Sequence, residues 1–269
     1  MPDVVATQSR FIAYVALSAA ARVSGPAVAT KLAERYPEWA RTAQAIEASG
    51  VADAPAGFLL LVGEQKLLVS FIDAPLPADC FQDDAHQRLW VGWEAAARAQ
   101  RAHVIVANLD TASDAPGKVQ AAAPVFATAA TLCELVPETL GVSWAASALF
   151  IAPDAIRQAA AAMRPDQLPV SELIKPCWYA GEPPDRQSLG LLTMGLAPFV
   201  GREIDHPPTG EQPSIIYNRC LNLALYLMRS GPVIRDGDTV GQTPTQRIVV
   251  RFGERGGVPT YQLDISTAG

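Results

Sequence analysis

The chain has 269 residues, of which 49% are hydrophobic and 18% are charged, so a sizeable core is available and wholesale disorder is excluded. Its length is long for one domain and comfortable for two, taking roughly 100–200 residues per domain. The formal net charge of −6 argues against a nucleic-acid partner and against an anionic membrane surface. Such partners require clustered Lys and Arg, and the 21 basic residues of this chain are scattered.

The cysteines indicate neither a zinc site nor a redox motif, because no CxxC or CxH spacing exists among Cys80, Cys133, Cys177 and Cys220. The apolar run that begins at Phe11 is short and lacks the flanks of a signal sequence. No uninterrupted apolar run approaches the ~20 residues that span a bilayer. We therefore expect a soluble, cytoplasmic protein with reduced thiols.

The first half of the chain predicts the element order β-α-β-β-α-β. Apolar and β-branched runs predict the strands, and apolar residues at helical spacing predict the helices. The expected elements are a strand at 11–17, a helix that opens at Ser24, strands at 57–62 and 66–72, a helix that carries Trp90 and Trp93, and a strand at 103–109. This order is that of a ferredoxin-like unit.

The pattern of the second half predicts a repeat of that order after a loop at 110–117 and a long apolar helix. The expected elements are a strand at 142–151, a short helix from Pro153, extended segments at 170–179 and 189–204, a helix at 215–229, and closing strands at 248–252 and 261–265. We therefore predict an α+β fold of two tandem ferredoxin-like (βαββαβ) units, with antiparallel sheets covered by helices. The first unit is residues 1–116, and residues 117–269 form a linker helix and the second unit.

The segments GLAPFVGREID and DGDTVG, with the helix between them, resemble an uncharacterised bacterial family, domain of unknown function 4261. The similarity extends more loosely upstream, through FIDAPLP, the Trp90 helix, HVIVAN and GVSWAASALFIAP. The resemblance implies an intracellular bacterial α+β protein without an agreed activity, of a kind that occurs near toxin or secretion genes. It supplies no catalytic residue.

A polar cluster follows the apolar run that ends at Gly201. Arg202, Glu203 and His206 would form a site if Glu203 accepted a proton and Arg202 held an anion. Alternation along a strand, however, places Arg202 and Glu203 on opposite faces. A strand end with a salt bridge is therefore the favoured interpretation, because structural ion pairs are the commoner cause of such clusters.

Asp236 and Asp238 flank a glycine, which suggests either a calcium loop or a tight turn. An EF-hand loop would need further oxygen ligands at alternate positions and a Glu at its twelfth position, and the chain lacks both. A turn in which Gly237 has positive φ explains the pattern better. No G-x-S-x-G elbow, P-loop or G-x-G-x-x-G motif is present, and the three histidines are widely separated, so we expect no cofactor and no metal.

Two hypotheses of function remain. The favoured one is a non-catalytic protein that binds a protein partner, such as a basic effector or another copy of itself, in an immunity-like or antitoxin-like role. Trp90 and Trp93 are expected in the core, although aromatic residues also anchor partners. The alternative is a hydrolase or transferase that acts on a small anionic substrate, and it requires Glu203 to line a pocket. Arg202, Glu203, His206, Asp236 and Asp238 are the candidate binding residues.

Overall fold

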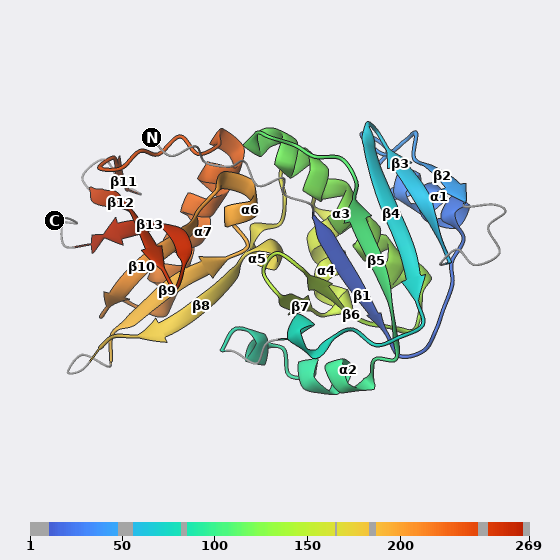
Figure 1. The fold of residues 1–269 in the computed structure, drawn as a ribbon, viewed down its shortest axis with the longest axis horizontal. Helices are drawn as coiled ribbons and strands as arrows, with labels where there is room; N and C mark the ends of the chain where they lie inside the picture. Colours follow the sequence, from blue (N-terminus) through green and yellow to red (C-terminus); the bar gives the residue numbers. More distant parts are fainter. Residues whose placement is uncertain are drawn as a thin grey trace.

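The computed structural model describes residues 11–47, 56–81, 85–164, 166–182, 187–241 and 247–265. Within them the chain forms two β-sheets that lie side by side, with the long helices packed against the inner face of each (Figure 1). The α+β fold class is therefore confirmed. The long helices α3 (Ala115–Leu135) and α7 (Pro213–Ser230) contact each other where the two halves meet.

The first sheet contains the N-terminal strands and, among the described residues, pairs every neighbouring strand antiparallel. Its order is β2 (Gln44–Glu47), β3 (Gly57–Val62), β4 (Gln65–Ile72), β5 (Ala102–Asn108), β1 (Ile12–Leu17), β6 (Thr139–Trp144) and β7 (Leu149–Ile151). Helices α1 (Gly25–Arg35), α3 and α4 (Pro153–Ala161) cover its inner face. Alternate strand residues such as Val15, Leu60 and Val104 are buried there.

Helix α3 is the centre of the core, because it is buried almost all round its circumference. A helix that is apolar on every side belongs in a protein interior, whereas a surface helix shows one apolar stripe. Asp114 caps its first turn by accepting a hydrogen bond from the Gly117 backbone. The helix contacts α1, α4, α7 and four strands of the first sheet, so one continuous core serves both halves.

The second sheet contains the C-terminal strands. Its order is β11 (Thr239–Val240), β12 (Ile248–Arg255), β13 (Val258–Asp264), β10 (Glu203–Thr209), β9 (Leu189–Met194) and β8 (Lys175–Ala180). Strands β10 and β13 run parallel, and the other strand pairs in the described residues are antiparallel. Helix α7 packs on the inner face through a helical stripe of Ile216, Cys220, Leu223, Ala224 and Leu227.

The finer prediction of two tandem ferredoxin-like units is not confirmed. A ferredoxin-like unit would place its first strand between its third and fourth strands, but here β5 lies between β4 and β1. Strands β6 and β7, which we expected in the second unit, complete the first sheet by pairing with the free edge of β1. A boundary at 116/117 therefore does not separate the two sheets.

Three segments that we predicted as continuous strands are interrupted. The segment 142–151 is divided between β6 and β7 by a turn in which Ala148 has a φ of 49°. The segment 170–179 begins with the short helix α5 (Val170–Leu173), and 189–204 contains α6 (Ala197–Val200) between β9 and β10. Gly195 and Gly201, with φ of 107° and 85°, bound α6. The backbone thus turns at glycines that a purely apolar pattern conceals.

Further short 3₁₀ turns, Ala78–Cys80 and Gln87–Leu89, precede α2 (Trp93–Ala99).

Candidate functional site

The polar residues predicted as a site lie on or beside strand β10, but they face different surroundings. Glu203 and Asp205 point to one side of the strand, and Ile204 and His206 point to the side that α7 covers, as strand alternation predicts. Both carboxylates and the imidazole are buried. A buried polar group has to be satisfied by hydrogen bonds, so its partners define its role.

Glu203 is enclosed by the turn that connects β9 to α6. Its Oε1 accepts hydrogen bonds from the backbone N–H groups of Gly195 and Ala197, both at 2.9 Å. Its Oε2 accepts from the Leu196 N–H at 3.1 Å and from the Thr193 hydroxyl at 2.7 Å. Burial raises the pKa of Glu203, and these hydrogen bonds oppose that shift. All four partners donate, so the carboxylate organises the turn and has little capacity left for a substrate.

Arg202 does not join Glu203 in a common site. Its guanidinium carbon lies 4.1 Å from the centre of the Phe252 ring, in a cation–π arrangement on the side of the sheet opposite to Glu203. His206 is 0% exposed and contacts α7 instead. The three residues of the predicted cluster therefore occupy three separate environments.

His206 belongs to a buried network with Arg219 of α7. Its Nδ1 lies 2.8 Å from the Pro207 carbonyl oxygen, which can only accept, so Nδ1 carries the proton. Its Nε2 then accepts from Arg219 at 2.6 Å, and Arg219 binds Glu211 through two hydrogen bonds of 2.6 and 2.8 Å. Burial lowers the pKa of His206, and the nearby Arg219 charge lowers it further. The imidazole is held neutral as an acceptor.

Sequence reasoning missed Arg219 and Glu211. A signal was present, because Arg219 lies three residues after Ile216 and one before Cys220, inside the apolar stripe of α7. A charged residue within a buried stripe requires a partner of opposite charge. The helical pattern does not identify that partner, because Glu211 lies before the first residue of α7.

Asp205 anchors a second polar group on the outer face of the second sheet. Its Oδ1 accepts from the Tyr179 hydroxyl at 2.6 Å, and its Oδ2 accepts from Arg255 Nε at 2.9 Å. The Arg255 guanidinium carbon lies 4.2 Å from the centre of the Tyr179 ring. Burial and the neighbouring Asp205 raise the pKa of Tyr179. Sequence reasoning singled out neither Tyr179 nor Arg255, which lie far from Asp205 along the chain.

Asp236 and Asp238 form the tight turn that we predicted. Gly237 has a φ of 87°, Asp238 accepts from the Arg235 N–H at 2.8 Å, and Asp236 accepts from the Phe252 N–H at 2.7 Å. Both carboxylates thus hold backbone groups. Among the described residues, no cluster of three or more His, Cys, Asp or Glu side chains is placed to hold a metal ion.

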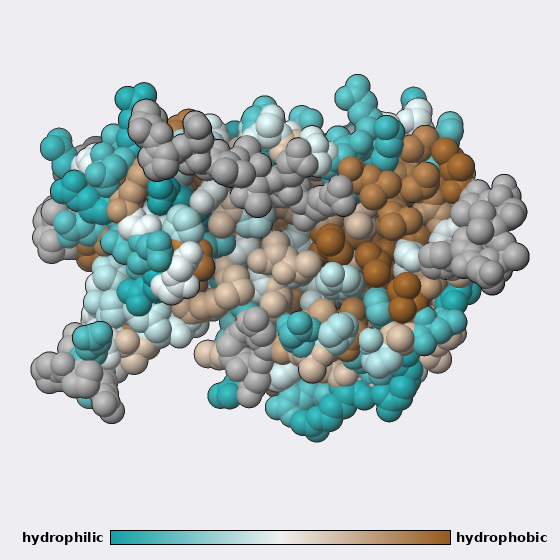
Figure 2. All heavy atoms as spheres, in the orientation of Figure 1, coloured by the Kyte–Doolittle hydropathy of each residue, from teal (hydrophilic) through white to brown (hydrophobic). Residues whose placement is uncertain are grey.

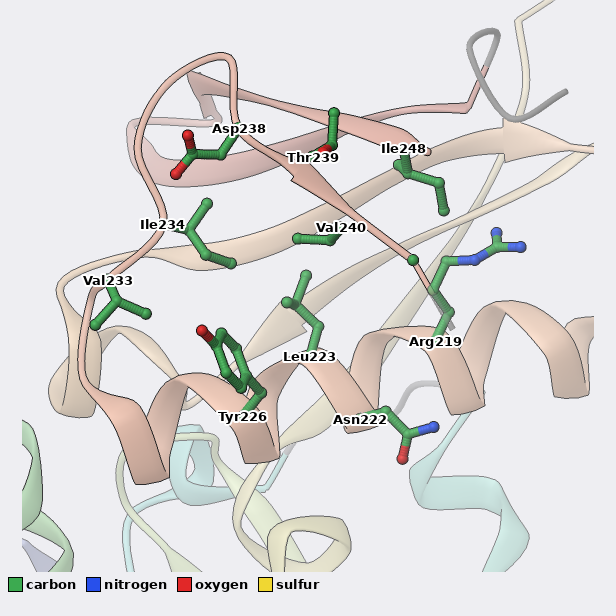
Figure 3. A pocket seen from close by; sticks show the side chains of 11 residues that line it. Arg219, Asn222, Leu223, Tyr226, Val233, Ile234, Asp238, Thr239, Val240 and Ile248 are labelled. Atoms are coloured by element: carbon green, nitrogen blue, oxygen red, sulfur yellow. The ribbon is translucent and has the colours of Figure 1, made fainter. Parts of the chain in front are cut away.

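A pocket of about 590 Å³ lies between α7 on one side and the segment 233–241 with Ile248 on the other (Figure 3). Leu223 points from the helix toward Ile234 and Val240, so the middle of the pocket is apolar. The two ionic residues of its lining are Arg219 and Asp238, and both are already engaged, in the buried network and in the turn. The pocket therefore offers an apolar crevice and no ready ionic chemistry.

Residues 192–259 match the family model of DUF4261, a domain of unknown function. The resemblance predicted from the sequence is confirmed over this segment. The DUF4261 segment contains α6, β10, α7, β11 and β12, and therefore the buried network of His206, Arg219 and Glu211. No curated protein and no solved structure matches the chain.

Outside the DUF4261 segment, the outer face of the first sheet carries a row of apolar side chains. Register pairs these residues directly, strand by strand: Ile46, Leu59, Leu68, Ala107 and Ile12. Ile46, Leu59 and Leu68 are 52%, 38% and 37% exposed. Figure 2 shows a brown area over the strands of this sheet. We call the five residues the apolar face, and contiguous apolar surface of this kind marks interaction sites.

The apolar face ends where the segment around α2 covers the sheet. There Trp90 packs against Phe150, with ring centres 5.0 Å apart, and Ala16 and Leu76 complete a small separate cluster. Trp90 and Trp93 are partly buried in this cluster, whereas Trp144 is fully buried in the main core. None of the helices in the described residues combines the length and the apolar character that a membrane span needs.

Proposed function

We propose that this protein is a non-catalytic binding protein that docks a protein partner on the apolar face. The observation that carries the proposal is the row of Ile46, Leu59, Leu68, Ala107 and Ile12 across five strands, in which Ile46, Leu59 and Leu68 are exposed and Ala107 and Ile12 are partly buried. Strands lie ~4.8 Å apart, so the row extends over roughly 20 Å. Leaving this much apolar surface in water is unfavourable, and burial against a partner removes that cost.

The dimensions favour a separable partner over an obligate subunit. A row of five side chains is a patch of a few hundred Å² at most, which suits the apolar centre of a standard interface of about 800 Å² per partner. Obligate dimers bury about 2,000 Å² or more in total and are more apolar throughout. A second copy is therefore the less favoured occupant.

The charge of the chain indicates the chemistry of the partner. With a formal net charge of −6, the protein attracts a basic protein and repels another copy of itself. This combination fits an immunity-like or antitoxin-like role against a basic effector. Charge complementarity would speed the encounter, and the apolar face would supply most of the affinity.

The enzyme alternative, a hydrolase or transferase with a site around Arg202, Glu203 and His206, has less support. The four acceptor positions of Glu203 are occupied by the backbone turn and by Thr193. A general base has to reach the proton that it abstracts, and this carboxylate is enclosed.

The test compares Leu59→Asp with Ile215→Asp. Both positions are exposed, and Ile215 lies in the first turn of α7, outside the apolar face. Partners captured from the native cells by tagged wild-type protein are purified, and their dissociation constants are measured for both variants. We expect Leu59→Asp to lose about 2 kcal/mol, roughly 30-fold in affinity, and Ile215→Asp to bind like the wild type.

Two results contradict the proposal. One is a purified partner that binds Leu59→Asp as tightly as the wild type. The other is a wild-type dimer in sedimentation that Leu59→Asp dissociates, which makes a second copy the occupant. Leu59→Thr, which suits a strand, serves if the aspartate prevents folding. Circular dichroism and thermal melts establish that each variant is folded.

A further inference from the structure

The outer face of the second sheet is polar, in contrast to the apolar face of the first. One row across its strands contains Leu192, Asp205, Gln262 and Arg251, and each residue lies opposite the next on the neighbouring strand. Arg255 follows Arg251 by four residues on β12 and reaches the same face, where it bonds Asp205.

Arg255 is held in a fixed orientation. Asp205, which is 3% exposed, accepts from its Nε at 2.9 Å, and the Tyr179 ring supports the guanidinium plane at 4.2 Å. Tyr179 is in turn bonded to the other oxygen of Asp205 at 2.6 Å. Two contacts thus fix one edge and one face of a side chain that ordinarily moves freely. Both oxygens of the Asp205 carboxylate therefore accept hydrogen bonds within the chain.

Within the described residues, the remaining donors of the two arginines have no hydrogen-bond acceptor. The terminal amino groups of Arg255 and the whole guanidinium of Arg251 make no hydrogen bond with the described part of the chain. The amide of Gln262 also makes none there. A guanidinium carries five N–H donors, so this face presents a surplus of donors over acceptors.

Gly253 explains how the amide lies between the two arginines. It stands midway between Arg251 and Arg255 on β12, opposite Thr260. A Cβ at this position would lie 2.3–2.6 Å from the amide atoms of Gln262, so the side chain of Gln262 occupies the space above the glycine. Glycine inside a strand marks such a close approach.

These residues line one hollow of about 630 Å³, together with Pro207, Pro208, Thr209 and the end of β13. Asp264 also lines the hollow, and it already interacts with another part of the chain. Two guanidiniums and an amide complement a group with several acceptor oxygens, because guanidinium binds carboxylate and phosphate through paired N–H donors. The lining also contains two carboxylates, of which Asp205 is hydrogen-bonded to Arg255 and Tyr179.

We propose that this hollow binds the oxyanion of a small molecule, a phosphate or a carboxylate, with Arg255 as the pre-oriented donor and Arg251 and Gln262 as the further donors. The site is separate from the apolar face and from the buried network of His206. Asp205 and Tyr179 position Arg255 and do not contact the ligand. A purely structural role for Arg255, as a tie between β12 and β10, would explain its two contacts but not the free donors beside it.

Nuclear magnetic resonance of the arginine Nε–H and glutamine side-chain signals tests this. Inorganic phosphate and succinate are titrated separately into the full chain at constant ionic strength. We expect a saturable shift of the Arg255 and Gln262 signals, with a dissociation constant on the order of millimolar. Saturation by phosphate alone, by succinate alone or by both supports the site and identifies the oxyanion.

The variants distinguish the site from general attraction of anions. Arg255→Gln should weaken binding at least tenfold, whereas Arg229→Gln, an exposed arginine at the end of α7, should leave it unchanged. Arg251→Gln removes an exposed side chain that makes no hydrogen bond with the residues that the structure describes, and it should also weaken binding, so the test survives if Arg255→Gln does not fold. Shifts that do not saturate, or that are equal in Arg255→Gln or Arg251→Gln and in the wild type, overturn the proposal.

Discussion

Replacing Glu203 by Gln changes one oxygen to an NH₂ group and leaves the size of the side chain unchanged. Each carboxylate oxygen accepts two hydrogen bonds, so whichever oxygen is replaced, the new amide nitrogen faces two donors. Thr193 cannot reverse its hydroxyl at no cost, because its oxygen already accepts from the Ile204 N–H at 2.7 Å. Two buried hydrogen bonds are therefore lost.

An unsatisfied buried donor costs about 1–3 kcal/mol, so the variant should lose roughly 4 kcal/mol of the free energy of unfolding. For a chain of this size, that corresponds to a fall of roughly 10 °C in the melting temperature. The assay is urea unfolding followed by circular dichroism. Glu254→Gln is the matched control, because this glutamate is exposed on β12, and it should change stability by less than about 0.5 kcal/mol. A Glu203→Gln variant within about 1 kcal/mol of the wild type would refute the argument that this carboxylate organises the turn.

Two further variants test the neighbourhood of β10. Burial lowers the pKa of His206 below its unfolded value of about 6.5, so its contribution to stability is complete above that pH and is lost as the pH falls toward the folded pKa. Urea melts between about pH 7 and pH 5 should show this loss, at most about 1.4 kcal/mol per pH unit, and His206→Gln should remove it; an unchanged slope in the variant contradicts the assignment. Gly195→Ala places a Cβ 2.6 Å from the Leu173 carbonyl oxygen at a φ of 107° and should cost about 2 kcal/mol or more, whereas Gly210→Ala has open space and should cost less than about 1 kcal/mol. Equal melting temperatures for the two alanine variants would show that the turn tolerates a side chain.

Local elements with strong turn chemistry were predictable. Strands β12 and β13 are joined by Gly256 and Gly257, with φ of 60° and 82°, and a Gly-Gly pair between two strand-like runs is itself a hairpin signal. Positive φ at both central residues is what a two-residue hairpin turn requires. Helix α7 was predicted within a few residues from its apolar stripe. These features depend on residues close together in the chain.

The order of the strands was not predictable in the same way. An apolar run such as 142–151 indicates a buried strand but does not say which edge it joins, and β6 joins β1 from more than a hundred residues away. The periodicity of a strand is the same in either sheet. For that reason, element types were recovered better than their arrangement.

The surroundings of the candidate binding residues were not predictable for a related reason. Strand alternation correctly indicated that Arg202 and Glu203 lie on opposite faces, but it did not indicate that Arg202 lies against a ring, Glu203 in a backbone turn and His206 against a helix. Their true partners come from elsewhere: Phe252, Thr193 and Arg219 lie on other elements. Contacts between elements cannot be read from spacing along one strand.

For the polar residues of β10, the hydrogen bonds that each side chain already makes say more about function than the residue types do. Glu203, Asp205 and His206 are buried and have partners within the chain, so each stabilises the fold and offers little to a substrate. A ligand or partner gains most from groups that the fold leaves unsatisfied: apolar side chains in water and donors without acceptors. In the described residues, such groups include the apolar face of the first sheet and the unbonded donors of Arg251 and Arg255 on the second. Because α1, α3 and α7 occupy the inner faces, both surfaces lie on the outer faces of the sheets, where a binding protein can change its specificity without repacking its core.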